Sequence, residues 1–377
     1  MKKMLRSIYF KLRSLLSFNI KEQPLLLFYN KENSLKNKQK IAEVKSRLKL
    51  FIPDIEFNTV SNISLINALN NSIIIYTGEK PPSLYTKLKT GLLFNLDYDL
   101  NDMDGWEYHR ILTLLEQKTI LANRPLARSK LASIKNQLKA KYNKAYIFGT
   151  GPSLEKAIDR SWGDGIRIVS NTIVKDKELW NHINPHFIVA GDAIYHYGFS
   201  RFAKNFRDDL AQRLAETDTY FVFQEQFFPF IKRQLPQFED RFIPIPIVNS
   251  QTFYNIIQDK FELPALGNVL NGLLLPLSQY LSDNINLWGF DGRSPDAKLF
   301  WKNSEKHFYS EHVAELQQLH PAFFNKLVPK DDPGQYVKTV HGDALNNMLL
   351  FAEQRGITFN MLHPSYTKTL MDRHRLL

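Results

Sequence analysis

The chain has 377 residues, with 49 Lys and Arg against 38 Asp and Glu, and it contains no cysteine. This length is sufficient for two ordinary domains, and the lack of cysteine excludes disulfides, thiolate metal sites and a cysteine nucleophile. No apolar run reaches the roughly 18 residues of a transmembrane helix, and Lys11 and Arg13 interrupt the stretch that a secretion signal would need. We therefore expect a cytoplasmic protein, as the absence of cysteine fits a reducing compartment.

The positive charge is concentrated at the start of the chain. Residues 1–50 contain 13 Lys and Arg against 3 Asp and Glu, and the remainder is nearly neutral. Apolar residues recur at helical spacing from Met1 to Ile20, which predicts a basic amphipathic helix over residues 1–22. Such a helix can rest on an anionic membrane surface. The alternative is a helix packed on the protein with its basic side in water. The near-neutral remainder argues against nucleic acid as a partner.

Residues 23–102 alternate strand and helix patterns. Apolar runs predict strands at Leu25–Tyr29, Ser72–Thr77 and Leu92–Leu96, and a helix is expected from Lys36 to Leu50. The segment has no glycine-rich phosphate turn and no clustered carboxylates. We interpret it as a small N-terminal α/β accessory domain.

Residues 103–142 form the predicted connection between domains. The stretch from Asp104 to Lys141 has a helical pattern with few breakers and has Pro125 near its middle. We expect two helices here that join the accessory domain to the rest of the chain.

Residues 143–377 predict a larger α/β domain with a Rossmann-like, mostly parallel sheet. The expected strands are Ala145–Phe148, Ile166–Ser170, Phe187–Ala190, Tyr220–Phe223, Phe242–Pro244, Ile285–Trp288 and Thr358–Leu362. Helical patterns lie between most of them.

The first of these strands ends in a glycine turn. Gly149 and Gly151 can adopt backbone conformations closed to other residues and allow a ligand to approach, and Pro152 and Ser153 suit the start of a helix. Because a helix N-terminus attracts anions, the turn predicts a nucleotide or sugar-nucleotide site. The alternative is a turn that only packs tightly.

Other strands also end in small or polar residues. Ser170-Asn171, Gly191-Asp192 and Gly289-Phe290-Asp291 each follow a predicted strand. In an open parallel sheet, ligands bind beyond the carboxyl ends of the strands. The pattern therefore predicts one cleft, lined by Asn171, Asp192 and Asp291, near the glycine turn.

These strand ends, followed by Gly267-Asn268-Val269, by His341 before a helix and by Leu362-His363-Pro364-Ser365, resemble a known family. The order is similar to that of bacterial sialyltransferases of glycosyltransferase family 42. It also resembles the related group with a pterin pyrophosphokinase and flagellin-modifying glycosyltransferases. The resemblance covers roughly residues 144–366 and implies a GT-A-like variant of the Rossmann-like sheet with a flexible lid.

The resemblance implies a metal-independent, inverting glycosyltransferase that uses a CMP-activated donor and no cofactor. The sugar would be sialic acid or another nonulosonate, and the acceptor a glycan or a lipid-linked glycan of the bacterial surface, such as lipooligosaccharide. A lipid-linked acceptor fits an enzyme held at the inner face of the plasma membrane by residues 1–20. Whether the chain forms a homo-oligomer stays open.

The family's site residues transfer by position. A histidine base and lid tyrosines that stabilise the leaving phosphate correspond to His341, Tyr309 and Tyr336. The residues that match its donor site are Gly149, Thr150, Gly151, Pro152, Ser153, Asn171, Asp192, Asn268, Asp291 and Arg293. Asp192 stands where the family usually has a second asparagine.

Several alternatives remain beside this hypothesis. His312 and His320 compete with His341 as the base. The aromatic segment from Trp301 to Tyr309 is either a lid or a helix with inward-packed rings. A pyrophosphokinase would use ATP and Mg²⁺, and a nucleotide-sugar-binding protein would keep the sheet without the base. The chain lacks a Walker loop, a Gly-x-Ser-x-Gly elbow and the third glycine of a dinucleotide-binding fingerprint. No Asp-x-Asp pair ends a strand of the second domain, so we expect no metal.

Overall fold

The structure, a computed structural model, describes residues 25–31, 34–63, 73–78, 93–96, 105–248, 256–292, 305–321, 323–324 and 343–375. The chain divides into two compact units. The first comprises Met1–Gln117 with His320–Phe324, and the second comprises Lys118–Leu319 with Asn325–Leu377. Both are α/β, as predicted, and each contains its own parallel sheet.

The first unit is built on a four-stranded parallel sheet with the order β2-β1-β3-β4. Its described elements are β1 (Leu26–Tyr29), α2 (Leu35–Phe51), β2 (Phe57–Val60), β3 (Ile73–Tyr76), β4 (Leu93–Asn95) and α5 (Gly105–Leu115). Strand β1 is fully buried and lies between β2 and β3, so its continuous apolar run was readable from sequence. Strand β2 was not predicted, because it lies at the sheet edge with two of its four residues exposed.

The second unit contains a seven-stranded sheet in which every pairing is parallel. The strands are β5 (Ala145–Phe148), β6 (Ile166–Ser170), β7 (Phe187–Val189), β8 (Tyr220–Gln224), β9 (Phe242–Ile245), β12 (Asn284–Trp288) and β13 (Thr358–Met361). Their order is β13-β12-β5-β6-β7-β8-β9. All seven predicted strands are present, and the Rossmann-like expectation is confirmed.

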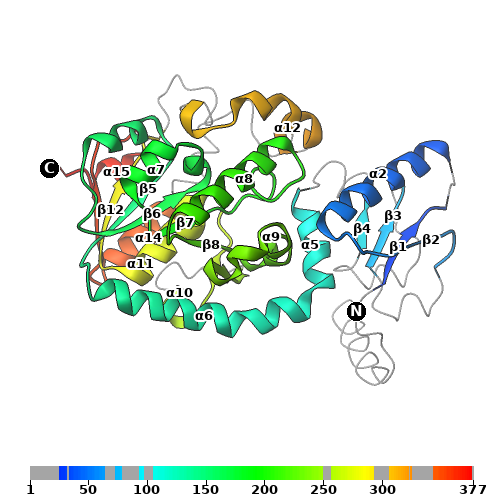
Figure 1. Ribbon diagram of the computed structural model, residues 1–377, viewed down its shortest axis with the longest axis horizontal. Coiled ribbons are helices and arrows are strands. Elements are labelled where there is room, and N and C mark those ends of the chain that lie inside the picture. The colour runs from blue at the N-terminus through cyan, green and yellow to red at the C-terminus, as the bar shows by residue number, and fades with distance from the viewer. Residues whose placement is uncertain are drawn as a thin grey trace. The chain divides into compact units, whose positions relative to one another are not determined.

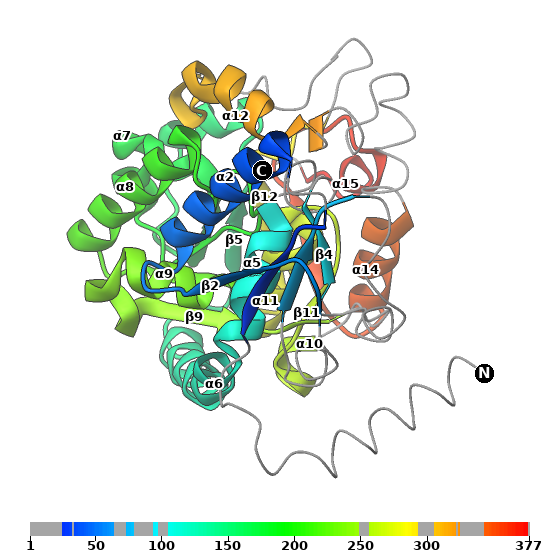
Figure 2. The same cartoon turned by 90° about the vertical axis from the view of Figure 1, so that its right-hand side faces the viewer.

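Helices cover this sheet on both sides. They comprise α6 (Gln117–Lys139), α7 (Lys177–Ile183), α8 (Arg201–Glu216), α9 (Phe228–Gln234), α10 (Ile256–Lys260), α11 (Leu275–Leu281), α12 (Val313–Leu319), α14 (Asp343–Glu353) and α15 (Lys368–Met371). Figures 1 and 2 show α7 and α8 on one side of the sheet and α11 and α14 on the other. Short 3₁₀ helices add η3 (Pro152–Asp159), η4 (Asn171–Lys175), η5 (Glu225–Phe227), η6 (Pro236–Arg241), η8 (Glu305–His307) and η9 (Ser310–His312), and η7 (Leu270–Leu274) is a π-helix. A two-stranded sheet pairs β10 (Ile247–Val248) with β11 (Leu263–Pro264).

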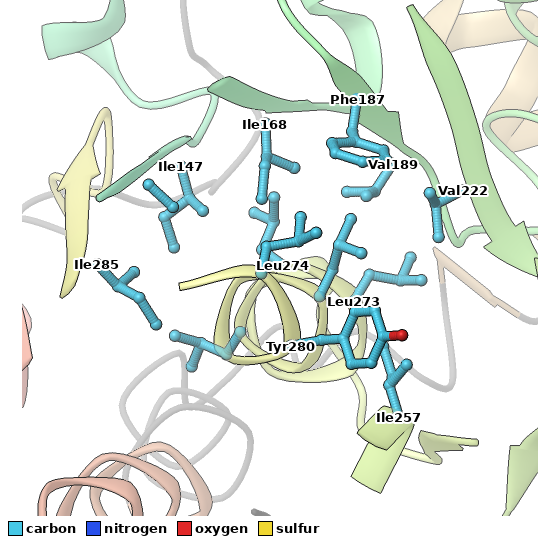
Figure 3. Close-up of a cluster of buried hydrophobic side chains, with 14 of the residues drawn as sticks. Ile147, Ile168, Phe187, Val189, Val222, Ile257, Leu273, Leu274, Tyr280 and Ile285 are labelled. Carbon is cyan, nitrogen blue, oxygen red and sulfur yellow. The ribbon is translucent and has the colours of Figure 1, made fainter. Parts of the chain in front are cut away.

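The main core lies between the sheet and the helices η7 and α11. Ile147, Ile168 and Val189 point from neighbouring strands toward Leu273 and Leu274, and all five side chains are buried (Figure 3). Burial on both faces explains why β5 and β7 are unbroken apolar runs in the sequence. This core fixes the strand ends that carry the candidate site.

The order of the large sheet reverses between β5 and β12. From β5 the chain moves outward through β6, β7, β8 and β9, and then returns to the other side of β5 with β12 and β13. Such a reversal is where open parallel sheets bind ligands, beyond the carboxyl ends of the two strands. In this unit, the loops that follow Phe148 and Trp288 occupy that position.

The connecting segment forms two helices, α5 and α6, as expected. They separate at Glu116, and Pro125 lies inside α6 without ending it. Helix α5 belongs to the first unit and nearly all of α6 to the second. The predicted helix over residues 1–22 lies outside the described residues. Within the described ranges, no helix is both long and apolar enough to cross a bilayer.

Candidate functional site

Two loops meet at the reversal point of the large sheet. The N–H of Gly149 donates to the carbonyl of Trp288, and the N–H of Gly151 donates to the carbonyl of Gly289, each at 2.8 Å. The glycine turn after β5 is therefore bound along its length to the loop after β12. This joins Gly149 and Gly151 to Asp291, as the sequence predicted.

The glycines allow the two loops to approach each other. A Cβ on Gly149 would lie 2.6 Å from the carbonyl oxygen of Gly289, and one on Gly151 would lie 2.2 Å from an Asp291 carboxylate oxygen. Gly289 adds a positive φ of 77°, which favours glycine. Packing between loops accounts for these glycines, whereas the sequence had suggested approach of a ligand.

Asp291 occupies the N-terminus of η3. The N–H of Ser153 donates to both of its carboxylate oxygens at 3.1 Å, and the Ser153 hydroxyl donates to one of them. Pro152 fills the first helical position, as predicted. The helix start is therefore capped by an internal carboxylate, and a donor phosphate would not find the Ser153 N–H and hydroxyl free.

Thr150 and Asn171 keep polar groups available at the same edge. Within the described residues, neither the N–H nor the hydroxyl of Thr150 has a hydrogen-bond partner. Asn171 follows β6, the strand beside β5, and has a positive φ of 51°. Its side-chain oxygen is buried and has no partner in the described part of the chain. The edge thus offers two donors on Thr150 and one acceptor on Asn171.

His363 supports the loop after β12 from the end of β13. Its Nε2 accepts the N–H of Gly289 at 2.9 Å, so its Nδ1 carries the proton and donates to the carbonyl of Pro364 at 2.7 Å. Burial lowers the pKa of His363 below its ordinary value. The neutral ring therefore holds Gly289, and the Ser365 hydroxyl donates to the Phe290 carbonyl at 2.7 Å. Sequence reasoning did not assign His363 to the site, although its place directly after the last strand was a signal.

Asp192 follows β7 and closes its own turn. Its carboxylate accepts the N–H groups of Ile194 at 2.8 Å and Tyr195 at 3.2 Å. The preceding Gly191 lies against η7, since a Cβ there would be 2.7 Å from Leu273. Asp192 thus lies at the predicted edge, with one carboxylate oxygen already used by the backbone.

Asn268 lies two residues before the π-helix η7. Its side-chain oxygen accepts the N–H of Asn271 at 2.8 Å. This is a capping contact, which a polar residue before a helix commonly makes. Through η7 and Gly191, Asn268 is connected to the same edge of the sheet.

Tyr309 packs against α8. Its hydroxyl donates to the Asp209 carboxylate at 2.5 Å, its ring lies edge-on to Phe202, and it is 1% exposed. Burial raises the pKa of Tyr309 far above its ordinary value. The structure gives Tyr309 a packing role, and a contact with a leaving phosphate would require the bond to Asp209 to break. These contacts favour packing, and the function of Tyr309 as a lid tyrosine stays a prediction.

The competing histidines have partners of their own. His312 Nε2 lies 2.8 Å from the Asn205 side-chain nitrogen on α8. His320 is fully buried and belongs to the segment His320–Phe324 of the first unit. Arg293, Tyr336 and His341 lie outside the described residues. The helix that follows His341 in sequence, α14, begins at Asp343.

The topology defines where α14 begins. It ends at Glu353, and β13 starts at Thr358 after a short connection, so the C-terminus of α14 lies near the amino end of the sheet. Eleven residues of helix packed along β13 return about 16 Å toward the carboxyl end. Asp343 therefore lies toward the edge that carries the glycine turn.

Among the described residues, no group of three His, Asp or Glu side chains is arranged to hold a metal ion. No known protein family matches the chain, and no curated protein matches it.

Proposed function

We propose that the protein is a glycosyltransferase that moves a sugar from a CMP-activated donor to a glycan or glycolipid acceptor. The observation that carries the proposal is the reversal point between β5 and β12, where the loops after both strands are bound to each other. Nucleotides bind at such points in open parallel sheets. Asn171, directly after the neighbouring strand β6, adds an acceptor suited to the hydroxyl and amino groups of a nucleoside.

The chemistry requires a stabilised leaving phosphate and a deprotonated acceptor hydroxyl. We assign phosphate binding to the N–H and hydroxyl of Thr150, because Gly149, Gly151 and Ser153 already use theirs within the protein. In the proposed reaction, the acceptor oxygen attacks the anomeric carbon, the bond from that carbon to the phosphate oxygen breaks, and CMP leaves. His341 takes the acceptor proton. A single displacement of this kind inverts the configuration at the anomeric carbon.

The donor class is tested by thermal unfolding in the presence of CMP, CDP, UDP, GDP or ATP. A ligand that binds only the folded chain raises the midpoint temperature of unfolding. At a hundredfold excess over Kd, it stabilises the folded chain by about 2.7 kcal/mol. Stabilisation by CMP alone supports the proposal. Stabilisation by ATP with Mg²⁺, and not by CMP, would instead support the pyrophosphokinase.

Thr150→Val tests the assigned phosphate contact with a side chain of almost the same shape. We expect CMP to bind about tenfold more weakly, since a hydrogen bond to a charged group contributes about 1.5–3 kcal/mol. Ser153→Ala is the matched comparison, because its hydroxyl is held by Asp291. Ser153→Ala should lower the stability of the chain and leave its CMP affinity nearly unchanged. A larger loss of CMP affinity in Ser153→Ala than in Thr150→Val would contradict the assignment.

His341→Ala separates an enzyme from a binding protein. The variant should bind CMP as the unmodified chain does, and sugar transfer should fall by about 10²–10⁴-fold. Full transfer activity in this variant would exclude His341 as the base. His312→Ala is the control, and it should leave the transfer rate nearly unchanged.

A further inference from the structure

The sheet of the first unit has a reversal point of its own. From β1 the chain moves outward to β2, and it returns past β1 to β3 and β4, with all pairings parallel. The rule that places ligands beyond the carboxyl ends at a reversal applies to this sheet as well. The loops that follow Tyr29 and Tyr76 stand at that position. The sequence had suggested an accessory domain and had left open whether it binds the acceptor, the membrane or a second subunit.

A buried amide lies between these two loops. Asn30 follows β1, is 5% exposed, and its side-chain oxygen is 3.5 Å from the Thr77 hydroxyl after β3 and 3.4 Å from the Asn37 amide. Its side-chain nitrogen has no partner within the described residues. That nitrogen provides two N–H donors at the reversal point, and a ligand oxygen would satisfy them.

The charge at the start of α2 favours an anion. Ser34 caps the helix by accepting the N–H of Asn37 at 3.2 Å, and the first turn contains no acidic residue. Residues 31–40 contain four lysines and one glutamate. Lysines at a helix N-terminus oppose the helix dipole, at a cost in stability. A bound oxyanion would remove this cost, because it would interact favourably with both the dipole and the lysines.

We infer that this edge of the first unit binds a phosphate-bearing sugar or polyol, its phosphate at the first turn of α2 and its hydroxyls on the amides and hydroxyl of Asn30, Asn37 and Thr77. The amides and the threonine hydroxyl both donate and accept hydrogen bonds, as sugar hydroxyls require. The helix start and its lysines supply the positive potential for the phosphate. The inference stands whether or not the second unit transfers sugar.

The test is isothermal titration of the full chain with glucose 6-phosphate, and separately with inorganic phosphate and with glucose. Glucose 6-phosphate should bind one to one, inorganic phosphate more weakly, and glucose not measurably. Asn30→Asp should lower the affinity for glucose 6-phosphate at least tenfold, because it replaces the N–H donors with a negative charge. Asn58→Asp, the same change at an exposed position of β2, should leave the glucose 6-phosphate affinity within twofold. Equal effects of the two changes, or no binding of glucose 6-phosphate, would overturn the inference.

A second pair of variants decides the question even if Asn30→Asp does not fold. Lys36→Glu and Lys49→Glu make the same charge change at opposite ends of α2. Lys36→Glu should raise thermal stability through the helix dipole and yet weaken glucose 6-phosphate about tenfold, whereas Lys49→Glu should leave the affinity within twofold. A substitution that acted only on helix stability would not raise the thermal stability and at the same time lower the affinity for glucose 6-phosphate. Equal weakening by both variants would indicate nonspecific attraction and reject the site.

To test the two units separately, CMP affinity is measured on the same four variants, Asn30→Asp, Asn58→Asp, Lys36→Glu and Lys49→Glu. It should be unchanged, since all four substitutions lie in the first unit. Competition between CMP and glucose 6-phosphate would place the sugar phosphate in the second unit and reject the inference. Lack of CMP binding, with glucose 6-phosphate still bound, would count against the glycosyltransferase alone.

Discussion

Gly149 carries a strict steric requirement at the candidate site. The space that a Cβ would need is filled by the carbonyl of Gly289 and by the Phe290 ring, at 2.6 and 2.7 Å. The carbonyl belongs to a backbone held by His363, so it cannot move aside cheaply. The glycine is thus explained by the junction of two loops.

Gly149→Ala should therefore destabilise the chain by about 1–3 kcal/mol, the usual cost of overpacking. Gly163→Ala is the matched control, because a Cβ on Gly163 would have no atom within 4 Å and the φ of this residue is not positive. The control should change stability by less than about 1 kcal/mol, in the stabilising direction. Urea unfolding of both variants measures the difference, and equal stabilities would contradict the account of the junction.

His196, beside the turn of Asp192, should make stability depend on pH. Burial lowers its pKa to about 3, while an unfolded histidine titrates near 6.5. The unfolded chain therefore binds more protons between these values, and stability falls as the pH drops below about 6.5. At pH 5 this histidine should have removed about 2 kcal/mol.

His196→Asn should reduce that loss, because asparagine does not titrate and its side-chain oxygen can still accept the Asp192 N–H that now bonds to Nδ1. Urea unfolding at pH 7, 6 and 5 gives the comparison. The fall in stability from pH 7 to pH 5 should be about 2 kcal/mol smaller in the variant than in the unmodified chain. An identical fall in both would show that His196 is not the group responsible.

At the scale of elements, the described residues from η8 to α12 are anchored on α8 and η4. Lys175 donates to the Phe308 carbonyl at 2.6 Å, and Tyr309 donates to Asp209 at 2.5 Å. Arg201 and Glu315 form an ion pair at 2.7 Å between α8 and α12. The sequence offered two interpretations of residues 301–309, a lid or inward-packed rings. For Tyr309 the contacts favour packing.

Tyr309→Phe tests this interpretation. Removing the hydroxyl leaves the half-buried Asp209 without its partner, so stability should fall by about 1–3 kcal/mol. Asp209→Asn should cost less, because an amide oxygen can still accept the hydroxyl. Thermal unfolding gives the stabilities, and a transfer assay gives kcat. A large fall in kcat with unchanged stability would show that Tyr309 takes part in catalysis.

At the scale of the whole molecule, the sequence predicted most strands of the two sheets. It predicted neither the edge strand β2 nor the order of the strands. Strands such as Ala145–Phe148 and Phe187–Val189 were predicted because parallel strands buried on both faces are continuous apolar runs. Strand β2 escaped because an edge strand with exposed Asn58 and Thr59 lacks that pattern. The strand order was not readable, since it depends on pairings between residues that lie far apart in the chain, such as Ile285 with Ala145.

The candidate site was predictable to the same extent. Gly149, Gly151 and Asp291 come together as expected, because strand ends of one parallel sheet share an edge. That Asp291 would take the helix start, leaving Thr150 as the free donor, could not be inferred. It depends on a contact between residues 138 positions apart. The part played by His363 likewise follows from a hydrogen bond to Gly289 that no local pattern encodes.

The uneven charge of the whole chain leads to a prediction about membranes. Met1 to Ile20 contains five Lys and Arg and no Asp or Glu, almost half of the net charge of +11. Each basic residue near an anionic membrane contributes about 1 kcal/mol. Deleting residues 1–20 should therefore abolish most co-sedimentation with vesicles rich in phosphatidylserine.

The control for that deletion keeps the length of the chain and changes only its charge. Replacing Lys2, Lys3, Arg6, Lys11 and Arg13 with glutamine should reduce vesicle binding nearly as much as the deletion does. Binding of the unmodified chain should also weaken as added salt shortens the Debye length below about 8 Å. Phosphatidylcholine vesicles should retain little of any of the three proteins. If the deleted chain sediments as the full chain does, the membrane contact belongs elsewhere or does not exist, and the amphipathic pattern of residues 1–20 serves packing.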